Sequence, residues 1–213
     1  MTALLDGIFI ILLLLNLLIL GKASLRSVIR VVSAQGVILG LLPLLLSPHL
    51  DFRLGLIVLG TIALKGVILP RMLVRALEEL SIRREVEPYI SFPGSLVLGA
   101  LGTGFAMFMS YRLPVALGLG SDLLTSASLS TVLTGFLVLT TRRKALTQVL
   151  GYLVLENGIF IFGLLLLEPL PFLVEVGVLL DLFVAIFVMG IVIHHINQEF
   201  ATESTERLTA LKD

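Results

Sequence analysis

The sequence predicts an all-α protein that crosses a membrane about seven times. Apolar blocks of roughly 20 residues, each holding at most one or two charges, alternate with short charged connectors. Of the 213 residues, 57% are hydrophobic and 14% are charged, and the mean hydropathy is +1.10. Inside lipid the backbone polar groups of such blocks can be satisfied only in helices. The net charge is zero, and no basic aromatic surface typical of nucleic-acid binding is present.

The seven membrane spans are expected at roughly residues 3–21, 27–46, 54–77, 92–111, 120–141, 145–167 and 172–195. Asp6 precedes the first block and no small-residue cleavage site follows it, so we expect a retained helix rather than a signal peptide. In the third span, Pro70 should free the carbonyl of Gly66 and kink or loosen the helix. The fourth span has a small-residue face suited to close packing, with Gly94, Gly99, Gly102 and Gly104.

The longest charged connector, residues 78–88, divides the chain into two parts. We expect a three-helix half over residues 1–80, a cytoplasmic connector with the fourth helix over 81–119, a second three-helix half over 120–197 and a polar tail over 198–213. Residues 32–42 can be aligned with residues 153–163, which places Gln35 opposite Glu156. This alignment indicates a parallel internal repeat, although apolar helices also align by chance, and both interpretations stay open.

Lys and Arg are distributed unequally between the two sides of the predicted helices. One side has only Arg53 and Arg112, whereas the other has Lys22, Arg26, Arg30, Arg71, Arg75, Arg83, Arg84, Arg142, Arg143, Lys144, Arg207 and Lys212. The positive-inside rule therefore predicts a multi-pass protein of the cell inner membrane, with the N-terminus outside and the C-terminus in the cytoplasm. The basic clusters serve either as topological anchors or as a docking surface for a cytoplasmic partner.

Four polar side chains are expected near the middle of the membrane: Gln35, Lys65, Glu156 and Asp181. An ionisable group at that depth costs about 3 kcal/mol on insertion scales, so it needs an opposite charge, a proton or a hydrated cavity. Two interpretations remain: a static pair of Lys65 with Glu156 or Asp181, or a proton or cation path. Asn157, next to Glu156, can bond a neighbouring helix or water.

Three more titratable side chains lie near the ends of the seventh span. His194 and His195 end it on the cytoplasmic side, where they either interact with the helix dipole or collect protons. Glu175, near the outer surface, is either simply solvated or part of a proton exit. Two adjacent His without a third ligand are weak support for a metal site. The chain has no Cys and therefore cannot ligate an iron–sulfur cluster, and no soluble catalytic or cofactor motif is present.

Several of these segments resemble a known family. Residues 148–158, with their Glu156-Asn157-Gly158 motif, and residues 63–70, 173–189 and 208–212 resemble the hydrogenase-4 component E family, membrane subunits in the formate hydrogenlyase group of nickel–iron hydrogenases. That family is similar to the K subunit of respiratory complex I and to the C subunit of multisubunit Na⁺/H⁺ antiporters, which have three helices. Glu156 and Asp181 correspond to the two carboxylates of those subunits. Gln35 and Lys65 occupy the equivalent places in the first half, which therefore lacks an acidic pair.

The resemblance implies a non-redox, non-catalytic membrane subunit of a complex that couples electron transfer to ion translocation. It implies antiporter-like and quinone-site-like membrane partners, and a peripheral arm that holds nickel–iron and iron–sulfur centres, with no cofactor in this chain. Glu156 and Asp181 would exchange a proton, and Lys65 would tune their affinity. Two alternatives stay open: a subunit of a multisubunit Na⁺/H⁺ antiporter, and a structural scaffold whose buried charges only fix helix register. The choice between H⁺ and Na⁺ is also open.

Overall fold

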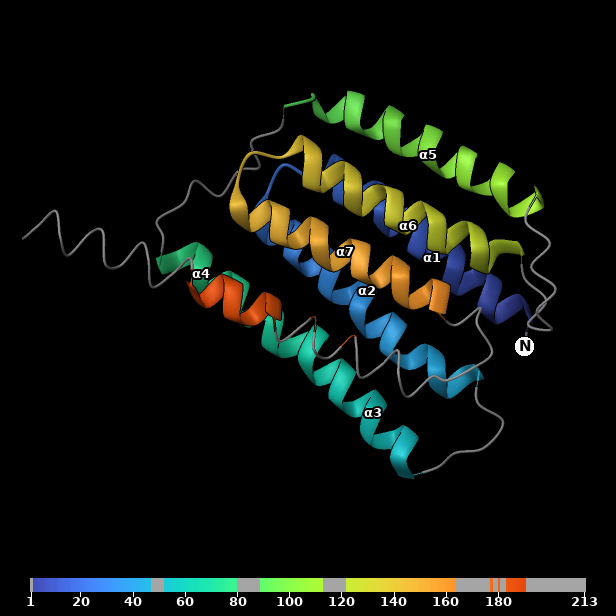
Figure 1. The fold of residues 1–213 in the computed structure, drawn as a ribbon, viewed down its shortest axis with the longest axis horizontal. Coiled ribbons are helices and arrows are strands. Elements are labelled where there is room, and N and C mark those ends of the chain that lie inside the picture. Colours follow the sequence, from blue (N-terminus) through green and yellow to red (C-terminus); the bar gives the residue numbers. More distant parts are fainter. Residues whose placement is uncertain are drawn as a thin grey trace, which may run out of the picture.

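A computed structural model describes residues 2–46, 52–79, 89–112, 122–163, 177, 180 and 183–190. Within these residues the regular elements are helices, as the sequence predicts (Figure 1). They are α1 (Thr2–Gly21), α2 (Leu25–Leu46), α3 (Phe52–Ala63), η1 (Leu64–Ile68), α4 (Leu69–Glu79), α5 (Phe92–Arg112), α6 (Asp122–Thr141) and α7 (Ala145–Gly163). The element η1 is a single π-helical stretch, and it joins α3 and α4 into one continuous span.

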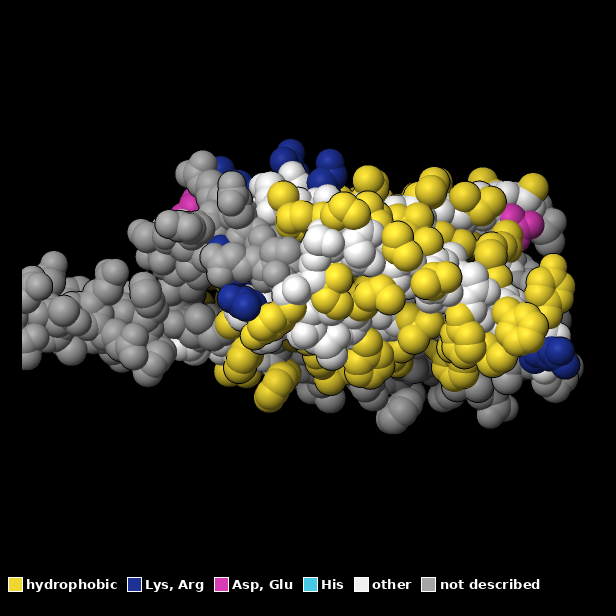
Figure 2. Space-filling model, turned by 90° about the horizontal axis from the view of Figure 1, so that it is seen from above, with side chains coloured by type: hydrophobic (Ala, Val, Ile, Leu, Met, Phe, Trp, Pro, Cys, Tyr) yellow, Lys and Arg dark blue, Asp and Glu magenta, His cyan; other side chains and the backbone are white. Residues whose placement is uncertain are grey.

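Six of the predicted spans are confirmed as helices long and apolar enough to cross a membrane. Of the predicted seventh span, residues 183–190 are helical, and most of the remainder lies outside the described residues. The face over α5 is covered with apolar side chains along most of its length, and Lys and Arg lie near its two ends (Figure 2). Its exposed apolar residues include Leu101, Phe105 and Phe108. Such a belt is typical of lipid contact, and the protein is therefore an all-α polytopic membrane protein.

The helices form successive layers, with α5 on one outer side, α3 and α4 on the other, and α1, α2, α6 and α7 between them (Figure 1). The closest pair is α6 with α7. A Cβ atom added to Gly135 would lie 2.5 Å from the backbone nitrogen of Leu155, and one added to Gly158 would lie 2.6 Å from that of Val132. The two backbones therefore touch directly, as small residues allow in membrane helices.

The glycines of α5 behave differently from the small-residue face that the sequence predicts. Gly99 does pack against the side chain of Leu20, but a Cβ added to Gly104 would meet nothing within 4 Å. Gly102 has only ordinary contact with Leu133. The α5 residues that are buried against the bundle are all small, namely Ser95, Gly99, Ala106 and Ser110. The predicted small-residue face is therefore present, but it does not include every glycine of this helix, most of which faces away from the bundle.

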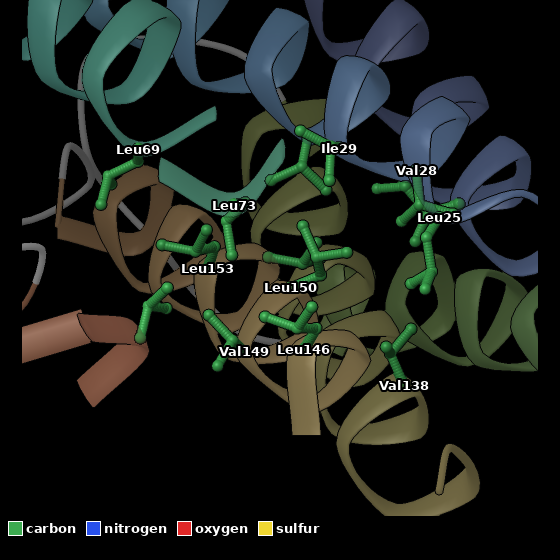
Figure 3. Packing of buried hydrophobic residues seen from close by; sticks show 14 of the residues in the cluster. Leu25, Val28, Ile29, Leu69, Leu73, Val138, Leu146, Val149, Leu150 and Leu153 are labelled. Atoms are coloured by element: carbon green, nitrogen blue, oxygen red, sulfur yellow. The ribbon is translucent and has the colours of Figure 1, made fainter. Parts of the chain in front are cut away.

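Two apolar clusters occupy the two ends of the bundle. One cluster lies where α1 ends and α2 and α7 begin, and it contains Leu25, Ile29, Leu73 and Leu150 (Figure 3). The other cluster is at the opposite end and contains Leu5, Phe9, Leu12, Leu39, Leu42 and Ile161. The stretches between the clusters carry buried polar side chains, namely Asn16, Gln35, Thr131, Glu156 and Asn157. A polar layer thus crosses the middle of an otherwise apolar bundle.

The third span is loosened just before Pro70, where a π-helical turn replaces the α-helix, as the sequence predicts. Proline has no backbone N–H, so the carbonyl of Gly66 loses its α-helical partner. Ser33 of α2 replaces that partner by donating its hydroxyl to the Gly66 carbonyl at 3.1 Å. Just before the proline, the Leu69 N–H bonds to the Leu64 carbonyl, which is the longer π-type spacing. Lys65 is therefore presented from a locally widened turn.

Candidate functional site

Lys65 and Glu156 form an ion pair inside the polar layer. Lys65 Nζ donates to Glu156 Oε1 at 2.6 Å and to Asn157 Oδ1 at 3.1 Å. The side chains of Lys65 and Glu156 are only 10% and 4% exposed. Two charges removed from water are tolerable when each compensates the other at short range and the remaining donors are bonded. Among the pairings left open by the sequence, the structure forms Lys65 with Glu156.

Close packing between α2 and η1 positions Lys65. A Cβ atom added to Gly36 would lie 2.8 Å from the Cβ of Lys65, and one added to Gly66 would lie 2.6 Å from Cγ2 of Val37. The aliphatic stem of Lys65 therefore packs directly on Gly36 of α2, where there is no room for a side chain. This constraint directs its ammonium group toward α7, where Glu156 and Asn157 occupy adjacent positions.

A chain of side-chain hydrogen bonds continues from Asn157 across the bundle. Asn157 Nδ2 donates to Gln35 Oε1 at 3.4 Å, and Gln35 Nε2 donates to Asn16 Oδ1 at 2.9 Å. Asn16 Nδ2 then donates to Thr131 Oγ1 at 2.9 Å. The chain links η1, α7, α2, α1 and α6, and it confirms that Asn157 bonds to neighbouring helices. Each buried amide in it has at least one protein partner, as burial demands.

The second oxygen of Glu156 differs from the first. Oε2 is buried and has no hydrogen-bond partner within the described part of the chain. Oε1, which bonds Lys65, also lies 3.5 Å from the position of a Cβ added to Gly177. A cavity of about 10 Å³, the size of roughly one water molecule, is lined by Ser33, Lys65 and Asn157, with Pro70 beside them. The carboxylate thus has one oxygen bonded to Lys65 and one without a hydrogen-bond partner among the described residues.

Other predicted site residues cannot be placed against this layer. Asp181, Glu175, His194 and His195 lie outside the described residues, so their roles stay predictions. Gln35, Lys65, Glu156 and Asn157, by contrast, meet in one hydrogen-bonded layer. Within the described ranges no group of three or more His, Cys, Asp or Glu could hold a metal ion.

Comparison with known proteins finds two kinds of related sequence. No protein-family model matches it, and no solved structure does. It is 32% identical over 206 residues to the uncharacterized protein Rv0085 of Mycobacterium tuberculosis, covering 95% of this chain and 93% of that protein. The chain belongs to the Rv0085 family. It is also 36% identical over 101 residues to hydrogenase-4 component E of Escherichia coli K12. That match covers 47% of this chain and 46% of component E, so this relationship extends over about half of each protein.

In this member of the Rv0085 family, sequence reasoning missed two residues of the polar layer, Asn16 and Thr131. Asn16 is an amide within the apolar stretch of α1, and the argument used for Glu156, that a polar group in a span needs a partner, applies to it as well. Thr131 gives no such signal, because α6 has many hydroxyl side chains, among them Thr125, Ser126, Ser128 and Ser130. Only the packing of α1 on α6 distinguishes Thr131 from them.

Proposed function

We propose that this chain is a non-redox membrane subunit of a hydrogenase-type complex, and that Lys65 and Glu156 lie on its proton path. The 101-residue similarity to hydrogenase-4 component E supports membership in a hydrogenase-type complex. The main support for the proton path is the buried Lys65–Glu156 pair in the middle of the bundle. Ionisable groups inside membrane helices are rare and costly, and they typically mark ion pathways and proton relays.

The geometry supports a specific exchange. In the paired state, Lys65 compensates the charge of Glu156. A proton that binds Oε2 neutralises the carboxyl group, weakens the ion pair and leaves Lys65 bonded to Asn157, which already accepts from it at 3.1 Å. Release of the proton restores the pair. Gln35 and Asn16 act in this scheme as positioning residues, because their amides hold Asn157 in place.

The finer expectations from the sequence complete the proposal. Asp181 is the next proton acceptor, and His194, His195 and Glu175 mark uptake and exit. Antiporter-like and quinone-site-like subunits adjoin the chain, and nickel–iron and iron–sulfur centres reside in a peripheral arm. The N-terminus lies outside and the C-terminus in the cytoplasm. These assignments follow from the resemblance and from the positive-inside rule.

The experiment is ion translocation by the intact complex in sealed vesicles, followed with a pH-sensitive dye. Glu156→Gln keeps the shape of the side chain and removes its proton affinity, so we expect electron transfer to continue with proton translocation lost. Glu78→Gln is the matched control, because Glu78 forms an ion pair with Arg26 that is exposed. Normal translocation by an equally assembled Glu156→Gln complex would refute the path.

A second function is favoured by the same contact. The ion pair at 2.6 Å also suits a structural scaffold in which Lys65 and Glu156 only fix helix register. The charge-swapped variant Lys65→Glu/Glu156→Lys separates the two functions. If the swapped complex both assembles and translocates ions, the pair is a scaffold. If the swapped complex assembles but does not translocate ions, the carboxylate has to be on α7, as a proton path requires. Repeating the assay with and without Na⁺ identifies the transported ion.

A further inference from the structure

A second, larger cavity opens between α2 and α4. Its volume is about 610 Å³, and its lining includes Ile29, Ser33, Gly66, Pro70, Arg71 and Glu78. It lies at the end of the bundle where α2 and α7 begin, since Ile29 also belongs to the apolar cluster at that end. We call this cavity the α2–α4 groove. The exchange between Lys65 and Glu156 requires water to deliver the proton, and this groove extends toward them.

The groove runs from the end of the bundle to the widened turn that carries Lys65. Glu78 is the next-to-last residue of α4, and Gly66, at the other limit of the lining, directly follows Lys65. Gly66 and Glu78 are about 18 Å apart along the helix axis at 1.5 Å per residue. Since the hydrocarbon core of a bilayer is about 30 Å thick, a groove of this length extends from the surface to the level of the polar layer.

The polar lining of the groove favours water as its content. Arg71 is exposed, lines the groove and lies about 12 Å inward from the end of α4 at Glu79, at 1.5 Å per residue. A guanidinium at such a depth needs water or an anion beside it, because its desolvation is costly. Glu78, the acidic residue among the described residues of the lining, already bonds Arg26 at 2.6 Å. Water therefore remains to solvate Arg71, and the groove is large enough for many water molecules.

Ser33 lies between the groove and the ion pair. The cavity of about 10 Å³ beside Lys65 and Asn157 shares three lining residues with the groove, Ile29, Ser33 and Pro70, so the two cavities meet at these residues. Ser33 is half-buried, and its hydroxyl donates to the Gly66 carbonyl at 3.1 Å. The oxygen of that hydroxyl keeps lone pairs that can accept a hydrogen bond from water. A small polar side chain is therefore what separates the groove from the water-sized cavity beside Lys65.

We propose that water enters the α2–α4 groove and reaches the Lys65–Glu156 pair past Ser33. The pair then exchanges protons with the side of the membrane on which α2 and α7 begin, which the positive-inside rule makes the cytoplasmic side. Ser33 acts as a positioning residue: rotation of its hydroxyl away from Gly66 joins the two cavities, and the return of that hydrogen bond separates them. The direction of proton exchange rests on the proposed function, whereas the entry of water does not.

The test measures how far water reaches, with thiols introduced one at a time. The chain has no Cys, so an introduced thiol is the only one in it, and its labelling in the intact complex in membrane vesicles is read by mass spectrometry of this chain. The reagent is a membrane-impermeant, negatively charged methanethiosulfonate, which reacts with the thiolate and therefore with a hydrated thiol. We expect Val74→Cys in the groove and Ser33→Cys at its inner end to react from the same side as Arg143→Cys. Arg143 is exposed where α7 begins and marks that side.

Ala100→Cys is the matched control. Ala100 lies as many residues after Phe92, the start of α5, as Ser33 lies after Leu25, the start of α2. Both helices start at the same end of the bundle, where Phe92 packs against the apolar cluster that contains Leu25. Ala100 is exposed on the apolar face of α5. Ser33→Cys should react at least about tenfold faster than Ala100→Cys, because a thiol in lipid stays protonated and unreactive.

Modification of Ser33→Cys should also stop proton translocation, and a reductant that removes the label should restore it. Equal reactivity of Ser33→Cys and Ala100→Cys, or reaction of Val74→Cys without Ser33→Cys, would overturn the water route, whatever the effect of Glu156→Gln. Unchanged translocation after complete labelling of Ser33→Cys would overturn the use of this route by protons. A reactive Ser33→Cys together with normal translocation by Glu156→Gln would support the water route and refute the proposed proton path.

Discussion

The two oxygens of Glu156 have different surroundings, and this difference underlies the stability of the site. Oε1 bonds Lys65 at 2.6 Å, while Oε2 is buried without a partner in the described residues. If Lys65 is removed, the buried carboxylate loses the ammonium group that compensates its charge. Breaking a buried pair in this way costs more than removing both charges, because one charge is left uncompensated.

We therefore predict that Lys65→Met lowers the free energy of unfolding by about 3 kcal/mol. The double variant Lys65→Met/Glu156→Gln should recover most of that loss, since it leaves no charge to compensate. Unfolding of the purified chain by SDS in mixed micelles, followed by circular dichroism, measures both. Equal stability of Lys65→Met and the wild type would show that the pair contributes nothing.

The amides of the polar layer should be energetically coupled. Gln35 bonds both Asn157 and Asn16, so Gln35→Leu leaves two buried groups without one of their partners. In a double-mutant cycle with Asn16→Leu, we expect a coupling energy of about 0.6 kcal/mol and at most roughly 1.7 kcal/mol, as for other hydrogen bonds between membrane helices. The same unfolding assay applies. Strictly additive losses would mean that the 2.9 Å contact does not stabilise the fold.

Part of this site can be predicted from the sequence, because each residue of a helix adds the same rise along the helix axis. Counting 1.5 Å per residue from the helix ends places Gln35, Lys65 and Glu156 near the middle of the membrane, and the structure brings them together. The pairing of Lys65 with Glu156 depends on how the helices are rotated. That rotation is set by contacts such as Gly36 against Lys65, which no spacing in the sequence reveals.

The effect of a glycine on how closely two helices pack depends on which face of its helix it occupies. Gly135 of α6 faces the backbone of α7, where an added Cβ would lie 2.5 Å from the Leu155 nitrogen, whereas Gly104 of α5 faces open space. Glycine is abundant in α5, so sequence reasoning expected a small-residue face suited to close packing there. It could not find the α6–α7 contact, because composition does not say which face of a helix meets a neighbour.

Gly135→Ala should consequently destabilise the protein by about 1 to 3 kcal/mol, because the added methyl group forces α6 and α7 apart. Gly104→Ala is the matched control on α5, and we expect it to be neutral or slightly stabilising since alanine favours helix. SDS unfolding of both variants provides the comparison. Similar free energies for the two would contradict the direct backbone contact between α6 and α7.

The free carbonyl in the third span was predictable, and the residue that bonds it was not. Pro70 removes a donor wherever it stands in a helix, so the free Gly66 carbonyl follows from the sequence alone. Ser33 satisfies that carbonyl from α2, because α2 and η1 approach closely through Gly36 and Gly66. Such a partner comes from tertiary packing, which local sequence does not specify.

At the scale of the whole molecule, Arg142 connects parts that are distant in sequence. Its side chain is 2% exposed, donates through Nη2 to the Leu20 carbonyl at 3.0 Å and stacks on Phe92 at 5.2 Å. It therefore joins the end of α1, the start of α5 and the turn between α6 and α7. Burial away from water lowers the pKa of its guanidinium below the ordinary value.

We predict that Arg142→Ala destabilises the assembled bundle by about 2 to 3 kcal/mol, through the lost charged hydrogen bond and cation–π contact. Arg143→Ala, at the exposed neighbouring position, should cost about 1 kcal/mol or less. Thermal unfolding in detergent gives the difference between the two variants. A larger loss for Arg143→Ala than for Arg142→Ala would contradict this account of the junction.

The most direct test of the proposed function follows the proton itself. Infrared difference spectroscopy of the intact complex, between its oxidised and reduced states, detects the carbonyl stretch of a carboxylic acid that gains or loses a proton. We predict such a band in the wild type and in Glu78→Gln, and its loss in Glu156→Gln. An unchanged band in Glu156→Gln would mean that Glu156 stays charged beside Lys65 throughout turnover, and the pair would then be structural.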